Sequence, residues 1–118
     1  MANEPVNLAE KLSLFSERWS PKIVAGFNGN DIMVVKVEGE FNWHSHPDTD
    51  DFFMVLSGRL RIQLRDGDVV LGPGELYVVP KGVEHCPLAE EETHLLLIEP
   101  AGVPNTGDPA NAAVKNRI

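Results

Sequence analysis

The chain has 118 residues, of which 42% are hydrophobic and 24% are charged, and its formal net charge is −8. This composition is typical of a globular protein, and the length suits one domain covering residues 1–118. An acidic surface argues against binding to nucleic acid or to an anionic membrane. The single cysteine excludes an internal disulfide, and the first residues, MANEPVNL, lack the basic and apolar parts of a secretory signal. We therefore expect a cytoplasmic protein.

The N-terminal part of the chain predicts one short helix. Asn7 is a suitable N-cap, because its side chain can accept a hydrogen bond from a backbone N–H of the first turn. Apolar residues then recur at helical spacing: Leu8, Leu12, Phe15 and Trp19. Pro21 ends the pattern, since the residue before a proline avoids the helical conformation. The helix is predicted to pack its apolar side on the rest of the molecule.

From residue 22 onward, short strand patterns are separated by turns that contain glycine or proline. Strands are predicted at residues 22–27, 32–38, 41–46, 51–57, 59–65, 69–71, 76–79, 85–89 and 93–99. The acidic run 90–92 is predicted to be a loop, and Asp108-Pro109 could cap a brief final helix. Many short strands with little helix indicate an all-β sandwich or barrel. Its core is expected at about residues 22–100, with 101–118 as a tail.

Two histidines in the predicted strand 41–46 are the first candidates for chemistry. Successive side chains of a strand alternate between its faces, so Asn42, His44 and His46 should share one face. Asp51 follows across a turn, and His85 follows a Pro-x-Gly turn much later. Zinc, iron, manganese, nickel and copper all accept imidazole and carboxylate ligands. Spacing alone leaves two interpretations open, a metal site and a polar strand with incidental histidines.

The same stretch resembles the first of two motifs that define the cupin superfamily. That motif has a glycine, then H-x-H, a glutamate and a second glycine, and the other has a glycine, P-x-G and a histidine. The corresponding residues here are Gly39, His44-Ser45-His46, Asp51 and Gly58, then Gly74, Pro80-Lys81-Gly82 and His85. The resemblance covers about residues 27–100. It implies an antiparallel jelly-roll β-barrel (a double-stranded β-helix) with a divalent transition metal bound by His44, His46, Asp51 and His85.

This chain departs from the family pattern in three places. Four residues separate Gly39 from His44, one fewer than usual, and Ala89 stands where an asparagine is common. Asp51 replaces the usual glutamate, and its side chain is shorter by one methylene, about 1.5 Å. Three arrangements of Asp51 stay open: direct binding through a shifted backbone, binding through water, and a site of three histidines alone.

The strand that begins at Asp51 predicts the wall of the pocket. Phe53, Val55 and Ser57 alternate with Asp51 and should face the barrel interior. The full set of predicted pocket-lining residues is Asn42, Phe53, Val55, Ser57 and His94. The opposite, outward faces are also apolar, with Phe41, Trp43, Phe52, Met54 and Leu56. Such a surface must be covered by the helix, by the N-terminal strands or by a second subunit, so we expect a homodimer.

The resemblance leaves several functions open. Related families include dioxygenases, sugar-phosphate isomerases and decarboxylases. The predicted inner face lacks the cations that a phosphorylated sugar would require, which favours an uncharged or aromatic substrate and oxygen chemistry. The alternatives are a non-catalytic barrel that binds or senses a small molecule, with or without metal, and a fold that has lost its metal. The sequence does not identify which of iron, manganese, nickel, zinc or copper would be bound.

Overall fold

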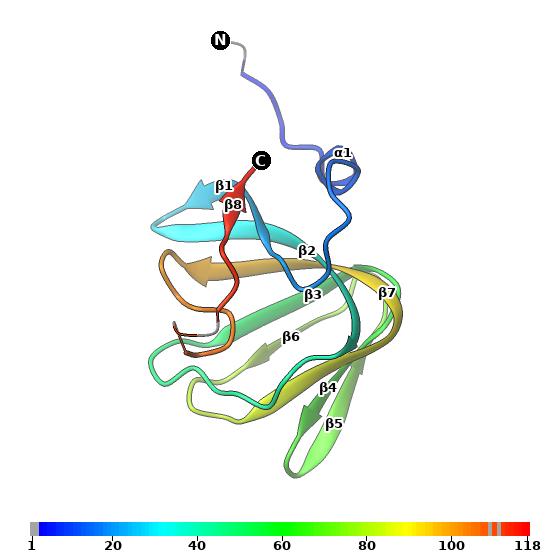
Figure 1. Cartoon of the computed structure of the whole chain (residues 1–118), viewed down its shortest axis with the longest axis vertical. Helices are drawn as coiled ribbons and strands as arrows, with labels where there is room; N and C mark the ends of the chain where they lie inside the picture. The colour runs from blue at the N-terminus through cyan, green and yellow to red at the C-terminus, as the bar shows by residue number, and fades with distance from the viewer. Residues whose placement is uncertain (1–2, 109, 111) are drawn as a thin grey trace.

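The computed structural model describes residues 3–108, 110 and 112–118 (Figure 1). Its elements are α1 (Leu8–Leu12), β1 (Lys22–Phe27), β2 (Asn30–Glu40), β3 (Asp51–Ser57), β4 (Leu60–Leu64), β5 (Gly67–Leu71), β6 (Leu76–Val79), β7 (His85–Pro100) and β8 (Asn116–Arg117). All strand pairs are antiparallel except β1 with β8. The prediction of an antiparallel jelly-roll barrel with a short N-terminal helix is confirmed. Among the described residues, no helix has the length and apolar character needed to cross a membrane.

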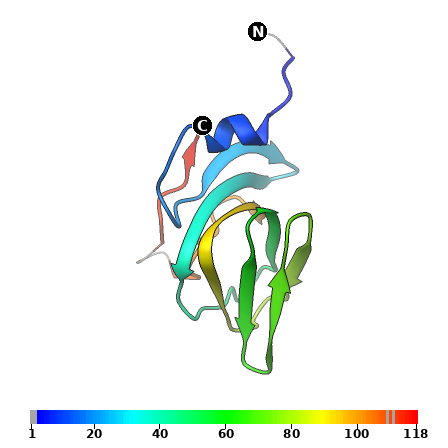
Figure 2. The same ribbon diagram turned by 90° about the vertical axis from the view of Figure 1, so that its right-hand side faces the viewer.

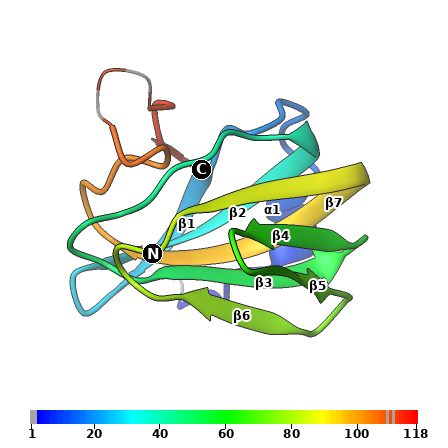
Figure 3. The same cartoon turned by 90° about the horizontal axis from the view of Figure 1, so that it is seen from below.

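The longest strand, β7, holds the barrel together. One of its edges pairs with β2, from Asn30↔Pro100 to Glu40↔Leu88. The other edge of β7 pairs with β3 through residues 94–96 and with β4 through residues 85–88. The strand curves from one side of the barrel to the other (Figure 2), and Figure 3 shows β4, β5, β3 and β6 along it. The inward side chains of these strands form one apolar core.

The acidic residues 90–92 lie inside β7, so the predicted loop there is wrong. Between the pairs Val37↔Thr93 and Gly39↔Ala89, three residues of β7 lie opposite one residue of β2. The glutamates are therefore the extra residues of a bulge, which bends a strand without ending it. They are exposed, as their charge requires.

Helix α1 is shorter than the predicted helix of residues 8–19. Its beginning is as expected, because Asn7 Oδ1 accepts a hydrogen bond from Glu10 N at 3.0 Å. It ends at Leu12, where the Ser13 hydroxyl donates to the Glu10 carbonyl at 2.6 Å. The chain then runs to β2, and Trp19 N donates to Lys36 O at 2.8 Å. Contacts with distant residues thus override the helical spacing of the later apolar residues.

Residues 41–46 do not form the predicted strand. They make one isolated bridge, in which His44 and His85 exchange backbone hydrogen bonds of 3.0 and 2.9 Å. Phe41 N also donates to Pro87 O at 2.9 Å, so the segment follows the start of β7 loosely. The alternation of side chains survives in part, since His44 and His46 are both buried.

The described parts of the C-terminal segment, 101–108, 110 and 112–118, lie along the barrel, and the last of them lies beside β1 (Figure 1). Its β8 pairs with β1 at Lys22↔Asn116 and Ile23↔Arg117. Gly107 lies so close to the 41–46 segment that an added Cβ would clash with Ser45 O. The brief helix predicted from Asp108-Pro109 falls on Pro109, which lies outside the described residues.

Candidate metal centre

Four buried side chains from separate parts of the chain meet inside the barrel. His44 and His46 belong to the segment after β2, Asp51 begins β3 and His85 begins β7. The Pro80–Gly82 turn is held to these segments by two backbone donors. Gly82 N donates to His46 O at 2.8 Å, and Lys81 N donates to Asp50 Oδ1 at 2.9 Å. The two sequence motifs are therefore joined by hydrogen bonds next to the cluster.

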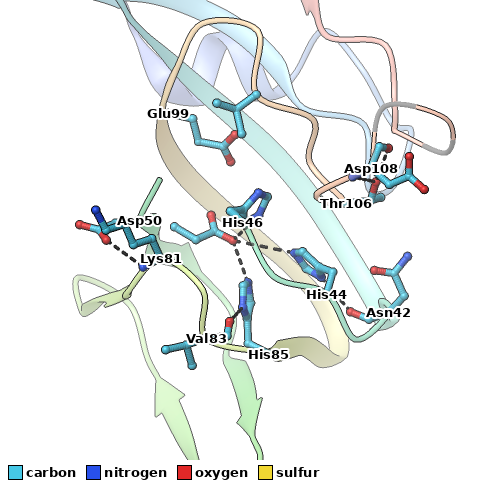
Figure 4. Close-up of polar contacts among 12 residues, drawn as sticks. Asn42, His44, His46, Asp50, Lys81, Val83, His85, Glu99, Thr106 and Asp108 are labelled. Atoms are coloured by element: carbon cyan, nitrogen blue, oxygen red, sulfur yellow. Dashed lines mark hydrogen bonds and ion pairs between the residues drawn. The ribbon is translucent and has the colours of Figure 1, made fainter. Parts of the chain in front are cut away.

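The cluster is centred on one carboxylate oxygen, Asp51 Oδ2. It lies 2.8 Å from His85 Nε2, 3.1 Å from His46 Nε2 and 3.9 Å from His44 Nε2. All four potential ligand atoms lie within 4.8 Å of one another, and all four residues are buried. Figure 4 shows the three imidazole rings turned toward one another. The shorter side chain of Asp51 therefore does reach the histidines.

Two backbone carbonyls determine which ring nitrogens face the cluster. His44 Nδ1 lies 2.9 Å from Asn42 O, and His85 Nδ1 lies 2.9 Å from Val83 O. A carbonyl oxygen only accepts, so each Nδ1 carries the hydrogen and donates it. A neutral ring with its hydrogen on Nδ1 carries its lone pair on Nε2, which is the form that binds metals, and a metal ion would take the place of the proton that the 2.8 Å contact of His85 Nε2 with Asp51 Oδ2 requires.

The electrostatics favour neutral imidazole at one position and a charged carboxylate beside it. Burial lowers the pKa of His44 to about 4. Burial also acts to lower the pKa of His46, but the carboxylate of Asp51 outweighs it and raises this pKa. Burial alone would raise the pKa of Asp51, yet His46 and His85 together lower it. Asp51 is thus available as an anionic ligand at neutral pH.

The unsatisfied atoms of His46 test whether a metal ion fits here. His46 Nδ1 is buried without a hydrogen-bond partner among the described residues, and the buried Nε2 has only the ion-pair contact with Asp51 Oδ2 at 3.1 Å, which does not form a well-aligned hydrogen bond. Buried polar atoms without partners are rare and call for an explanation such as an ion. A divalent ion bound to Nε2 would provide one, and the donor set of imidazole nitrogen and carboxylate oxygen suits transition metals. The residues present could hold such an ion.

A small cavity of about 40 Å³ adjoins the cluster. Its lining residues are Trp19, Pro21, Val35, Val37, Phe41, His44, Asp51, Phe53, Pro87, Leu95, Leu97, Glu99 and Asn105. Trp19 and Phe41 stack on one another, with ring centroids 4.7 Å apart. The wall is therefore largely apolar and aromatic, with two candidate metal ligands at one side.

Only some of the residues predicted to line the pocket do so. Phe53 lines the cavity, and Val55 is completely buried in the adjoining core. The expectation fails for Asn42, whose side chain is exposed because residues 41–46 are not a regular strand. It also fails for Ser57, because the register shift between Val55 and Ser57 interrupts the alternation.

His94 lies on the outside of the barrel, contrary to the prediction. Its Nε2 is 2.6 Å from Glu92 Oε2, and it faces a groove beside α1. The inward phase of β7 is the other one, with Leu95, Leu97 and Glu99 buried. Apolar residues lie on both faces of this part of β7, so the alternation pattern did not show which face points into the barrel.

The sequence interpretation missed Trp19, Phe41, Glu99 and Asn105 as lining residues. Phe41 was expected to point outward, but in an irregular segment it turns inward onto Trp19. Glu99 is 4% exposed, and burial and the charge of Asp51 raise its pKa. The sequence did contain one signal for Glu99: it lies on the same strand face as Leu95 and Leu97, where a charged residue is unusual.

Comparisons with known proteins agree with this architecture. A family model described as "Cupin domain" matches residues 31–99. A cupin-2 domain containing protein from Shewanella frigidimarina is 50% identical, with a TM-score of 0.80 over 80% of this chain and 93% of that one. A protein from Neisseria meningitidis is 33% identical, with a TM-score of 0.75 over 83% of this chain and 100% of that one. The uncharacterised protein YdbB of Bacillus subtilis is 32% identical over 64% of this chain and 68% of its own length. From the match over residues 31–99 and the barrel that carries it, the chain belongs to the cupin domain family.

Proposed function

We propose that this protein binds one divalent transition metal ion through His44, His46, Asp51 and His85 and binds or acts on a small molecule in the adjoining cavity. The convergence of four buried ligand atoms within 4.8 Å supports the proposal most strongly. The two Nδ1–carbonyl hydrogen bonds add to it, since they aim the lone pairs of His44 and His85 at one point. Four protein ligands leave one or two positions of an octahedral ion open for the small molecule.

The bound ion would supply Lewis acidity, or redox chemistry if it is iron, manganese or copper. The protein contributes the surroundings. The stacked Trp19 and Phe41 and the apolar side chains of β2 and β7 limit the access of water to the ligand. The cavity of about 40 Å³ is much smaller than the roughly 150 Å³ cavity that accommodates benzene. The sequence suggested an uncharged or aromatic substrate, and this size favours a small uncharged ligand over an aromatic one.

Metal analysis of the purified protein tests the proposal. We expect close to one equivalent of a transition metal by elemental analysis. His46→Ala should abolish binding, because it removes a buried ligand, whereas Asp51→Ala should weaken it. His94→Ala is the matched control, because this histidine lies outside the barrel, and it should retain the metal. Less than about a tenth of an equivalent in the unmodified protein would instead favour a barrel that has lost its metal.

Turnover separates an enzyme from a binding protein. The cavity wall offers few groups for acid–base chemistry, and this favours the second candidate, a barrel that binds or senses its ligand without converting it. Reconstitution with Fe(II) under anaerobic conditions, followed by oxygen uptake on a panel of small molecules, distinguishes the two. Uptake that depends on one compound would establish oxygen chemistry. Saturable binding without uptake would support the non-catalytic function.

We also propose that the protein forms a homodimer through the outer face of β3 and β6. On this face Leu76 and Val78 of β6 are 53% and 40% exposed. They pair with Met54 and Phe52 of β3, which are half-buried. Helix α1 covers the neighbouring Leu56 but leaves this patch open. Adjacent exposed apolar side chains of this kind are typical of contact surfaces.

A further inference from the structure

The carboxylate of Glu99 lies in the cavity with one oxygen unused. Glu99 ends the inward row of β7, lines the same cavity as His44 and Asp51, and is 4% exposed. Its Oε2 lies 3.2 Å from Lys115 Nζ. No hydrogen bond or ion pair joins Oε1 to any residue in the described part of the chain. Figure 4 shows this carboxylate on the side of Glu99 that faces His46.

Lys115 comes from the C-terminal segment and holds Glu99 in place. Besides Glu99, its Nζ donates to the backbone carbonyl of Val103. Two further contacts fix the segment: Ala113 N donates to Asn105 Oδ1 within it at 2.9 Å, and Ile118 N donates to Ile23 O of β1 at 2.9 Å. The Lys115 side chain, which is 12% exposed, is therefore held in a fixed position and orients the carboxylate.

Stability alone does not account for this pair. Removing two charges from water is costly, and apolar replacements of a buried ion pair are often equally stable or more stable. Glu99 Oε1 has no donor among the described residues, and because the residue is only 4% exposed, few water molecules can reach this oxygen. A ligand that donates a hydrogen bond to Oε1 would supply the missing donor.

We propose that Glu99 is the residue that anchors the ligand of this cavity, that Lys115 positions it, and that the ligand is a short uncharged molecule carrying a hydroxyl group. The inference rests on the proposed function, in which the same ligand lies beside the metal site. The hydroxyl donates to Glu99 Oε1, and the rest of the molecule contacts the apolar wall. A cavity of about 40 Å³ has room for two or three water-sized groups, or about three to five bonded non-hydrogen atoms.

Two ketones of matched shape provide the test. Hydroxyacetone and 2-butanone differ only by a hydroxyl in place of a methyl group. Their dissociation constants for the zinc-loaded protein can be measured by ligand-observed NMR titration, where zinc avoids redox turnover. We expect hydroxyacetone to bind at least about tenfold more tightly, because hydrogen bonds to charged groups are strong and 2-butanone leaves Oε1 unpaired.

The variants separate anchoring from folding. Glu99→Leu combined with Lys115→Met removes both charges at once and should abolish the preference while zinc content stays near one equivalent. Lys115→Met alone should reduce the preference, and Lys115→Arg should restore most of it. The control pair is Arg61→Gln with Asp68→Asn, which removes an exposed ion pair elsewhere and should leave the preference intact.

Three results would overturn the inference. They are equal affinity of the unmodified protein for the two ketones, no binding of either ketone at 100 mM, and a preference that survives in the double variant with Glu99→Leu and Lys115→Met. Failure of the metal proposal gives a different result, since the protein would then contain no zinc. The same NMR titration on the metal-free protein would still show whether Glu99 selects the hydroxyl.

Discussion

The backbone carbonyls of Asn42 and Val83 fix the orientation of the His44 and His85 imidazole rings. Each accepts a hydrogen bond from the Nδ1 of the histidine two residues later, at 2.9 Å. Because both contacts are local, the orientation of these rings depends on the shape of short segments and not on a distant partner. Asp51 then needs only to present one oxygen to rings that are already oriented.

The low pKa of His44 makes the stability of the metal-free protein depend on pH. Its pKa is about 4 in the folded protein and about 6.5 in the unfolded chain. Between these values the unfolded state binds a proton that the folded state does not, so stability falls as the pH drops from about 6.5 to about 4. At pH 5 the loss attributable to His44 should be about 2 kcal/mol relative to pH 7.

Urea unfolding of the metal-free protein at pH 7 and pH 5 measures this loss. His44→Gln provides the comparison, because glutamine does not titrate. The decrease in the free energy of unfolding should be smaller in this variant by about 2 kcal/mol. Equal decreases in both proteins would show that His44 titrates normally. His46 opposes the effect, since its pKa is raised, but it is common to both proteins.

At the scale of single residues, the sequence predicted the four members of the cluster but not Glu99, Trp19 and Phe41, which line the adjoining cavity. His44, His46, Asp51 and His85 meet as the resemblance implied. Glu99 was missed because the row from His94 to Ile98 is apolar on both faces, which conceals the inward phase. Trp19 and Phe41 reach the cavity from irregular segments, where no periodicity predicts direction.

Among the elements, the turn between β3 and β4 depends on Gly58. Its φ of +91° is in the region that L side chains rarely adopt, and an added Cβ would lie 2.5 Å from Thr93 Oγ1 and 2.9 Å from Thr93 Cα. Thr93 Oγ1 accepts from Arg59 N at 3.1 Å and donates to Arg59 O at 3.0 Å. The turn is thus fastened to β7 next to its bulge.

Gly58→Ala should lower the free energy of unfolding by about 2–5 kcal/mol. Left-handed backbone strain contributes about 1–2 kcal/mol, and the clash with Thr93 adds about 1–3 kcal/mol. Gly74→Ala is the matched control, because Gly74 has a φ of +81° but no other atom of the described residues lies within 4 Å of its added Cβ. Chemical denaturation of both variants gives the difference. Equal destabilisation would mean that Thr93 moves aside freely.

Strand prediction succeeded where local pattern and tertiary pairing agree. The bounds of β1, β3 and β6 were all predicted as they stand. The helix and the segment 41–46 were predicted too regular, because long-range contacts to β2 and β7 determine their course. The acidic run in β7 was predicted to be a loop, since a charged bulge and a loop have the same local composition.

For the whole molecule, the open apolar patch on β3 and β6 predicts association. Sedimentation equilibrium at micromolar concentration should give about twice the chain mass of 13.0 kDa. Val78→Glu should shift the protein to monomer, because it places a charge in the apolar contact. Val114→Glu is the control, since Val114 is 75% exposed in the C-terminal segment and away from β6. A monomeric unmodified protein would contradict the dimer.

The curved course of β7 ties the site to the cooperativity of the entire chain. His85 begins this strand and Glu99 is the residue before its last one; they are 14 residues apart and would be separated by about 46 Å in a straight strand. Both nevertheless border one small site, with His85 against Asp51 and Glu99 in the cavity that Asp51 lines. Local unfolding of a single hairpin would therefore disrupt the whole site and not only part of it. Ligand binding should slow hydrogen exchange throughout β2, β3, β4 and β7 together, because the occupied state is lost only on global opening.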